Sequence, residues 1–153
     1  MEQKVMTPEE KLQSLGFQLK QVRPAAGNYV SHVRVGNLIF TAGQGVDEFH
    51  GKLGKELTLE EGYDAAQQSM LNLLSVIKYE LGNLNKVKRI VKLLGFVNST
   101  EDFTDHPKVI NGASDLLVKV FGERGRHARS ALGMAQLPNN TSVEIEMIVE
   151  VED

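Results

Sequence analysis

Four basic side chains lie within six residues of a chain whose net charge is −3, in the stretch RGRHARSALGMAQLP. They are Arg124, Arg126, His127 and Arg129, and a run of small side chains follows them. The glycines around Arg124 and Arg126 favour a solvent-exposed loop for these two. Arg129 stands where the loop becomes an expected strand, and a planar guanidinium can bind a carboxylate through two parallel hydrogen bonds. We therefore single out Arg129 as a candidate carboxylate ligand.

Glu144 is the second candidate, because we expect its strand to lie beside the strand of Arg129 in the sheet. A carboxylate near a bound substrate could act in proton transfer. It could equally be the protein partner of Arg129 in a buried ion pair. The residue types alone leave both interpretations open.

The sequence contains no motif for a metal site, a phosphate-binding loop or a serine nucleophile. Cysteine is absent, and the four histidines show no metal-ligand spacing, so we expect no metal site. The glycines at 43–45 and 51–55 complete no phosphate-binding motif and are better explained as turn residues. No nucleophile elbow surrounds Ser31 or Ser130, and no Ser-His-Asp arrangement follows from their spacing. We expect no cofactor.

The 153 residues suit one domain, with 41% hydrophobic and 24% charged side chains. No apolar run approaches the roughly 20 residues that span a bilayer, and the polar start lacks a secretory core, so we expect a cytoplasmic protein. Only 6% of the side chains are aromatic. With the net negative charge, this makes a nucleic-acid partner unlikely on sequence grounds.

These candidate residues must be positioned by a series of short elements. Thr7 and Pro8 predict an N-terminal helix that ends at Gly16. A capping box at Thr58 and Glu61 begins a long helix that ends near Gly82, and a second amphipathic stripe ends at Gly122. The predicted strands are 17–22, 29–35, 38–43, 87–99, 129–136 and 142–152.

After the N-terminal helix the order is therefore β-β-β-α-β-α-β-β. It predicts a two-layer α+β domain with a mixed sheet and both main helices on one face. Alternation places Arg129 on one side of its strand with Ala131 and Gly133, and we expect this side to be the uncovered face, near Ile148 and Phe40 or Leu38. Such a face suggests self-association, as a dimer or a trimer.

From about residue 25 to residue 151, the chain resembles the RidA/YjgF family of reactive-intermediate deaminases, formerly called L-PSP endoribonucleases. The motifs that carry the resemblance are AAGNYV, GNLIFTAGQ, FVNSTEDF, the Asn111 position and, most specifically, ARSALGMAQLPNNTSVEIE. Residues 1–17 would be a helical extension that places the chain in a longer, divergent branch.

The resemblance implies a chorismate-mutase-like fold in a homotrimer with active sites in the clefts between subunits. It implies hydrolysis of 2-imino acids such as 2-iminobutanoate and 2-iminopropanoate, the latter from 2-aminoacrylate, to 2-keto acids and ammonia without a cofactor. Carried over by motif, Arg129 would bind the carboxylate and Glu144 would position or activate water. Tyr29 would line the cleft, and Asn111 would lie near its rim.

The chain departs from the family pattern at Ala42, where serine is common, at Gly45, where an apolar residue is usual, and at Ser114, where an aromatic is frequent. These departures motivate a second hypothesis, a non-catalytic trimer that binds 2-keto acids or related small carboxylates. A third hypothesis, endoribonuclease action, follows the old family name and is disfavoured by the composition.

Overall fold

Three α-helices and five strands follow one another along residues 5–153, the part of the chain that the computed structural model describes. Residues 1–4 of the predicted N-terminal extension lie outside the described residues. The helices are α1 (Pro8–Ser14), α2 (Leu59–Leu81) and α3 (His106–Phe121). The strands are β1 (His32–Val35), β2 (Leu38–Thr41), β3 (Val87–Asn98), β4 (Ala128–Met134) and β5 (Val143–Val151).

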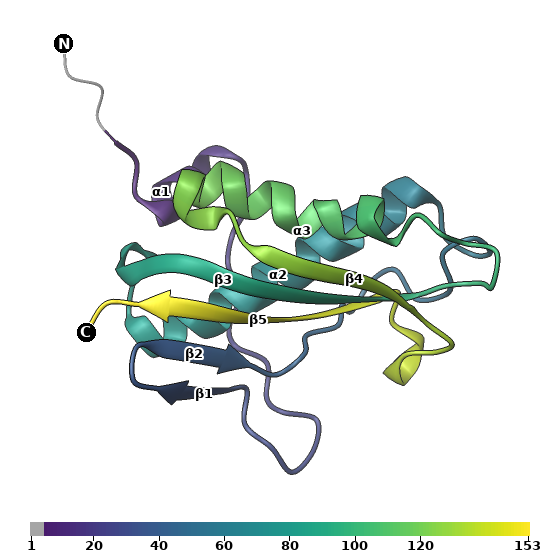
Figure 1. The fold of residues 1–153 in the computed structure, drawn as a ribbon, viewed down its shortest axis with the longest axis horizontal. Helices are drawn as coiled ribbons and strands as arrows, with labels where there is room; N and C mark the ends of the chain where they lie inside the picture. Colours follow the sequence, from purple (N-terminus) through teal and green to yellow (C-terminus); the bar gives the residue numbers. More distant parts are fainter. Residues whose placement is uncertain (1–4) are drawn as a thin grey trace.

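The strands form one mixed sheet in the order β1-β2-β5-β3-β4 (Figure 1). Strands β3 and β4 are parallel, and the other neighbouring pairs are antiparallel. The predicted strand at 17–22 is wrong, because these residues pair with no strand. Its alternation has another cause: Phe17 and Leu19 pack against the core at the edge of the helical layer.

The predicted helix signals are confirmed. Thr7 and Thr58 both form capping boxes with the glutamate three residues later, and Gly82 ends α2 with a φ of 85°. Helices α2 and α3 lie on the same side of the sheet (Figure 1). Within residues 5–153, none of the helices is long and apolar enough to cross a membrane.

The helices cover the face of β5 that carries its odd-numbered residues. These five side chains are buried: Val143, Ile145, Met147, Val149 and Val151. Strand β3 supplies the matching core residues Leu93 and Val97. The opposite face has no covering layer within the described chain, and it exposes Leu38, Phe40 and Leu132.

The predicted orientation of β4 is wrong. Register pairs Arg129 with Leu93 and Gly133 with Val97, so these β4 residues lie on the helix-covered face. The uncovered face of β4 carries Leu132 instead, across from Phe96. Alternation separates two sets of side chains, but only pairing with β3 decides which set faces the helices.

Candidate functional site

Arg129 lies at the outer strand of the sheet, beneath the first turns of α3. Its Nη1 donates to Asn111 Oδ1 at 2.8 Å and to Ser114 Oγ at 3.0 Å, and its Nη2 donates to the Pro107 carbonyl at 3.3 Å. Among the described residues, Nε and one Nη2 hydrogen have no acceptor. All three acceptors are neutral, and burial lowers the pKa of the guanidinium, while Asp115 acts in the opposite direction. Because arginine is not deprotonated in proteins, the guanidinium remains positively charged, and two of its N–H donors are available to a ligand.

His127 and Ser114 extend this cluster. Nδ1 of His127 lies 2.7 Å from the Gly125 carbonyl, and Nε2 lies 2.9 Å from Ser114 Oγ. Because a carbonyl can only accept, Nδ1 carries the proton. Burial is the main cause that lowers the pKa of His127, with Arg129 contributing, so the ring is neutral and Nε2 accepts from the Ser114 hydroxyl. The Ser114 hydroxyl can then accept a hydrogen bond from Arg129, so each polar group in this series of hydrogen bonds has a partner.

Glu144 lies on the opposite face of the sheet, in a pocket of about 340 Å³. It is partly buried, and burial raises the pKa of its carboxyl, with a smaller contribution from Glu146. A Cβ on Gly43 would stand 2.7 Å from Glu144 Oε2, so a side chain at position 43 would displace the Glu144 side chain. The Gly43 amide donates to no acceptor among the described residues.

Tyr29 lines the same pocket and is 52% exposed. Its hydroxyl accepts from the Ala26 amide at 3.3 Å. Ser31, Arg23 and His50 also line the pocket. Sequence reasoning missed Gly43 and Ser31 as pocket residues: the glycine resembles any turn glycine, and the serine has no motif around it.

The four predicted site residues therefore form two groups within one chain. Asn111 contacts Arg129, and Tyr29 shares a pocket with Glu144. The predicted adjacency of the Arg129 and Glu144 strands is wrong, because β3 lies between β4 and β5. The two side chains also lie on opposite faces, since Arg129 pairs in register with Leu93 and Glu144 with Phe96.

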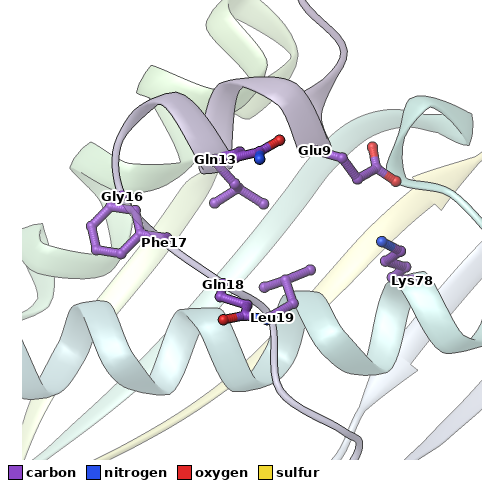
Figure 2. Close-up of a pocket in the computed structure, with 8 residues that line it drawn as sticks. Glu9, Gln13, Gly16, Phe17, Gln18, Leu19 and Lys78 are labelled. Carbon is purple, nitrogen blue, oxygen red and sulfur yellow. The ribbon is translucent and has the colours of Figure 1, made fainter.

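A larger pocket, of about 620 Å³, lies between α1, the segment that follows it, and α2 (Figure 2). Glu9 and Lys78 lie at one end of it and Phe17 at the other. Glu9 accepts a hydrogen bond from the Leu84 amide at 2.8 Å, which gives it a structural role. None of the predicted site residues lines this pocket. Across residues 5–153, no group of His, Asp and Glu side chains is arranged to hold a metal ion.

The family model described as "YjgF/chorismate_mutase-like, putative endoribonuclease" matches residues 9–151 of the chain. The chain is 45% identical over 148 residues to Protein TCP17 of Trypanosoma cruzi, across 93% of this chain and 92% of that protein. It is 33% identical over 129 residues to the 2-iminobutanoate/2-iminopropanoate deaminase of Salmonella typhimurium, across 82% of this chain and 89% of that enzyme.

The fold is similar to the crystal structure of a protein of unknown function from Agrobacterium tumefaciens, with a TM-score of 0.88 and 42% identity. That match covers 95% of this chain and 92% of the other. These two relatives, at 45% and 42% identity, thus have names that state no reaction, and the named deaminase is 33% identical.

Proposed function

Because this chain belongs to the YjgF/RidA family, we propose that it is a cytoplasmic, cofactor-free deaminase that hydrolyses small 2-imino acids to 2-keto acids and ammonia. The deaminase name of the Salmonella typhimurium relative supplies the reaction class. The chemistry must come from this chain's own residues, and two of them have suitable environments.

The observation that carries the proposal is the state of Arg129. Its guanidinium is oriented by Asn111, Ser114 and Pro107 and keeps two N–H donors available, and no carboxylate of residues 5–153 lies within hydrogen-bond distance of it. A charged group held this way favours an anionic ligand, and charge-assisted hydrogen bonds are roughly twice as strong as neutral ones. A substrate carboxylate would supply both the acceptors and the missing negative charge.

Glu144 is suited to the second task, activation of water. The water oxygen forms a bond to the imine carbon while its proton passes to the Glu144 carboxylate. As this bond forms, the C=N electron pair moves to nitrogen, and Glu144 gives that proton to nitrogen, which yields a carbinolamine. Glu144 then removes the hydroxyl proton as the C=O bond forms and the C–N bond breaks, and it passes this proton to the departing nitrogen, which leaves as ammonia. A raised pKa makes the Glu144 carboxylate a stronger base than that of an ordinary glutamate.

The two groups need a second copy of the chain to act on one substrate. Arg129 lies on edge strand β4, whereas Tyr29 precedes β1, the strand at the opposite edge of the sheet. A head-to-tail ring brings one edge of each subunit to the opposite edge of the next. We propose that a homotrimer of this kind forms clefts in which Arg129 and Asn111 of one subunit face Tyr29 and Glu144 of its neighbour.

The test couples the purified protein to a threonine dehydratase and follows 2-keto acid release. We expect Arg129→Ala to lower kcat/KM about 100-fold, which equals about 2.7 kcal/mol, and Arg129→Lys to retain part of the activity. Arg126→Ala is the matched control, since Arg126 is an exposed arginine in the same stretch whose Nε lies 3.3 Å from Glu123.

Acceleration by the wild-type protein no greater than by Arg129→Ala would refute the deaminase proposal. Calorimetric measurement of 2-keto acid binding distinguishes the deaminase proposal from the alternative of a non-catalytic trimer that only binds such acids. Binding that requires Arg129, in a protein without turnover, would support that alternative.

A further inference from the structure

Ser31, His32 and Glu80 form a continuous chain of hydrogen bonds at the edge of the Glu144 pocket. Ser31 Oγ lies 2.9 Å from His32 Nδ1, and His32 Nε2 lies 2.8 Å from Glu80 Oε1. Ser31 immediately precedes β1 and His32 is its first residue, whereas Glu80 lies in the last turn of α2. The fold therefore brings together three groups whose sequence positions give no sign of a common site.

The positions of the protons in this series of hydrogen bonds follow from the carboxylate of Glu80. The hydrogen bond from His32 is the main cause that lowers the pKa of Glu80, and the positive charge of Arg34, whose Nη1 is 3.6 Å from Glu80, acts in the same direction. Ionised Glu80 accepts from Nε2–H of His32. In neutral His32 the lone pair is then on Nδ1, directed at the Ser31 hydroxyl. A hydroxyl, a base and a carboxylate that orients the base are the parts of an activated nucleophile.

The surroundings of Ser31 give a substrate room to bind. Ser31 lines the pocket of about 340 Å³ together with Gly43 and Gly45. The Ala42 amide donates to the Ser31 carbonyl at 2.8 Å, which holds Ser31 beside the glycine segment that follows β2. Within residues 5–153, the amides of Gly43 and Gly45 donate to no protein acceptor. Free backbone N–H groups are the donors that stabilise an oxyanion.

We propose that Ser31 is a nucleophile that takes an acyl group from esters of short carboxylic acids, with His32 as its general base and Glu80 as the residue that positions His32. The Ser31 Oγ–carbon bond forms as the hydroxyl proton passes to His32 Nδ1, and the carbonyl electron pair moves to oxygen. The ester C–O bond then breaks, and the leaving alkoxide takes the proton from His32.

Hydrolysis of the acyl-serine completes the cycle. Water attacks the acyl carbon as His32 removes its proton, the Ser31 Oγ–carbon bond breaks, and Ser31 regains a proton from His32. One ester and one water thus give one carboxylic acid and one alcohol. Only nucleophile, base and water take part, so no cofactor or redox partner is required.

The experiment treats the full-length protein with 4-nitrophenyl acetate, follows 4-nitrophenolate release, and locates acetyl groups by mass spectrometry of peptides. We expect a burst of 4-nitrophenolate and an acetyl group on Ser31. Ser31→Ala should abolish that adduct, and His32→Gln should slow acetylation about 100-fold. Glu80→Gln, which keeps a hydrogen-bond acceptor but removes the charge, should give an intermediate rate.

Ser14→Ala is the matched control, because it removes an exposed serine hydroxyl that donates to Lys11 O at 2.7 Å, far along the chain from the pocket. It should acetylate Ser31 at the wild-type rate. An unmodified Ser31 in the wild-type protein, or equal acetylation rates in wild type and His32→Gln, would overturn the proposal. The assay contains no imine, so its result is independent of the deaminase proposal.

Discussion

At the scale of single residues, the two principal site groups have opposite electrostatic environments. Among the described residues, Arg129 donates hydrogen bonds only to neutral acceptors, so its positive charge is available to a ligand. Glu144 is partly buried and close enough to Glu146 for repulsion, so its negative charge is disfavoured. An anion at Arg129 and a proton at Glu144 would each relieve the unfavourable environment, which suits binding of a carboxylate and acceptance of a proton.

Glu144→Gln tests the raised pKa through the pH dependence of stability. The wild-type free energy of unfolding should fall as pH rises through the raised pKa, because the folded state then carries a partly buried charge. The glutamine variant lacks this loss. Urea unfolding should therefore show the variant more stable by less than about 1 kcal/mol near neutral pH, and the difference should shrink below about pH 4.

The same variant tests the base. If Glu144 must be ionised to act, wild-type kcat/KM should rise with pH through a pKa above the usual glutamate value. Glu144→Gln should lower the rate and lose this limb of the profile. An unchanged acidic limb in the variant would assign it to another group.

At the scale of elements, the position of Arg129 depends on α3. This helix supplies Asn111, Ser114 and the Pro107 carbonyl, and it packs closely on α2. The contact is closest at Gly112, where an added Cβ would stand 2.0 Å from the Tyr63 carbonyl oxygen. The helix pair can reach this separation only because the residue at the crossing has no side chain.

Gly112→Ala should therefore destabilise the protein by about 2 to 3 kcal/mol or more, since the backbones of α2 and α3 must move apart. Urea unfolding measures the loss. Lys119→Ala, an exposed position of the same helix, should change the unfolding free energy by less than about 0.5 kcal/mol. Equal stability of Gly112→Ala and wild type would mean that the helix crossing tolerates a wider spacing.

At the scale of the whole molecule, we propose that one subunit holds two half-sites, which only a second copy of the chain completes. The face of the sheet opposite the helices exposes Leu38, Phe40 and Leu132, and it has no covering layer among the described elements. An apolar face of this kind is suited to contact with other copies of the chain. Such contacts would bring the half-sites of neighbouring subunits within reach of one substrate.

Leu132→Asp places a charge on this face, where Leu132 is 46% exposed in the single subunit. We expect light scattering after gel filtration to show a trimer for wild type and a monomer for the variant, with an unchanged far-ultraviolet circular dichroism spectrum. Keto-acid formation should fall with the loss of trimer. Ser130→Asp, on the same face of the same strand, is a second variant with the same expectation. A wild-type protein that is monomeric at assay concentration would refute the shared cleft.

The sequence by itself determined most elements and the family. Capping boxes and cap glycines are local interactions within a few residues, so the limits of α1 and α2 could be predicted from adjacent side chains. The motif around Arg129 and Glu144 was sufficient to indicate the family, which the comparisons confirm. The segment 17–22 was the exception, because alternation records which side chains are buried and does not record whether the backbone has a strand partner.

Only the tertiary structure decided which of these residues meet. The insertion of β3 between β4 and β5 separates Arg129 from Glu144 and directs them to opposite faces. The same fold brings Glu80 to His32 and Ser31 across 48 positions of the chain. Strand order and register depend on contacts between distant segments, which local patterns do not encode. The basic stretch could single out Arg129 as a candidate ligand residue, but the partners of that arginine are set by the packing of α3 on the sheet.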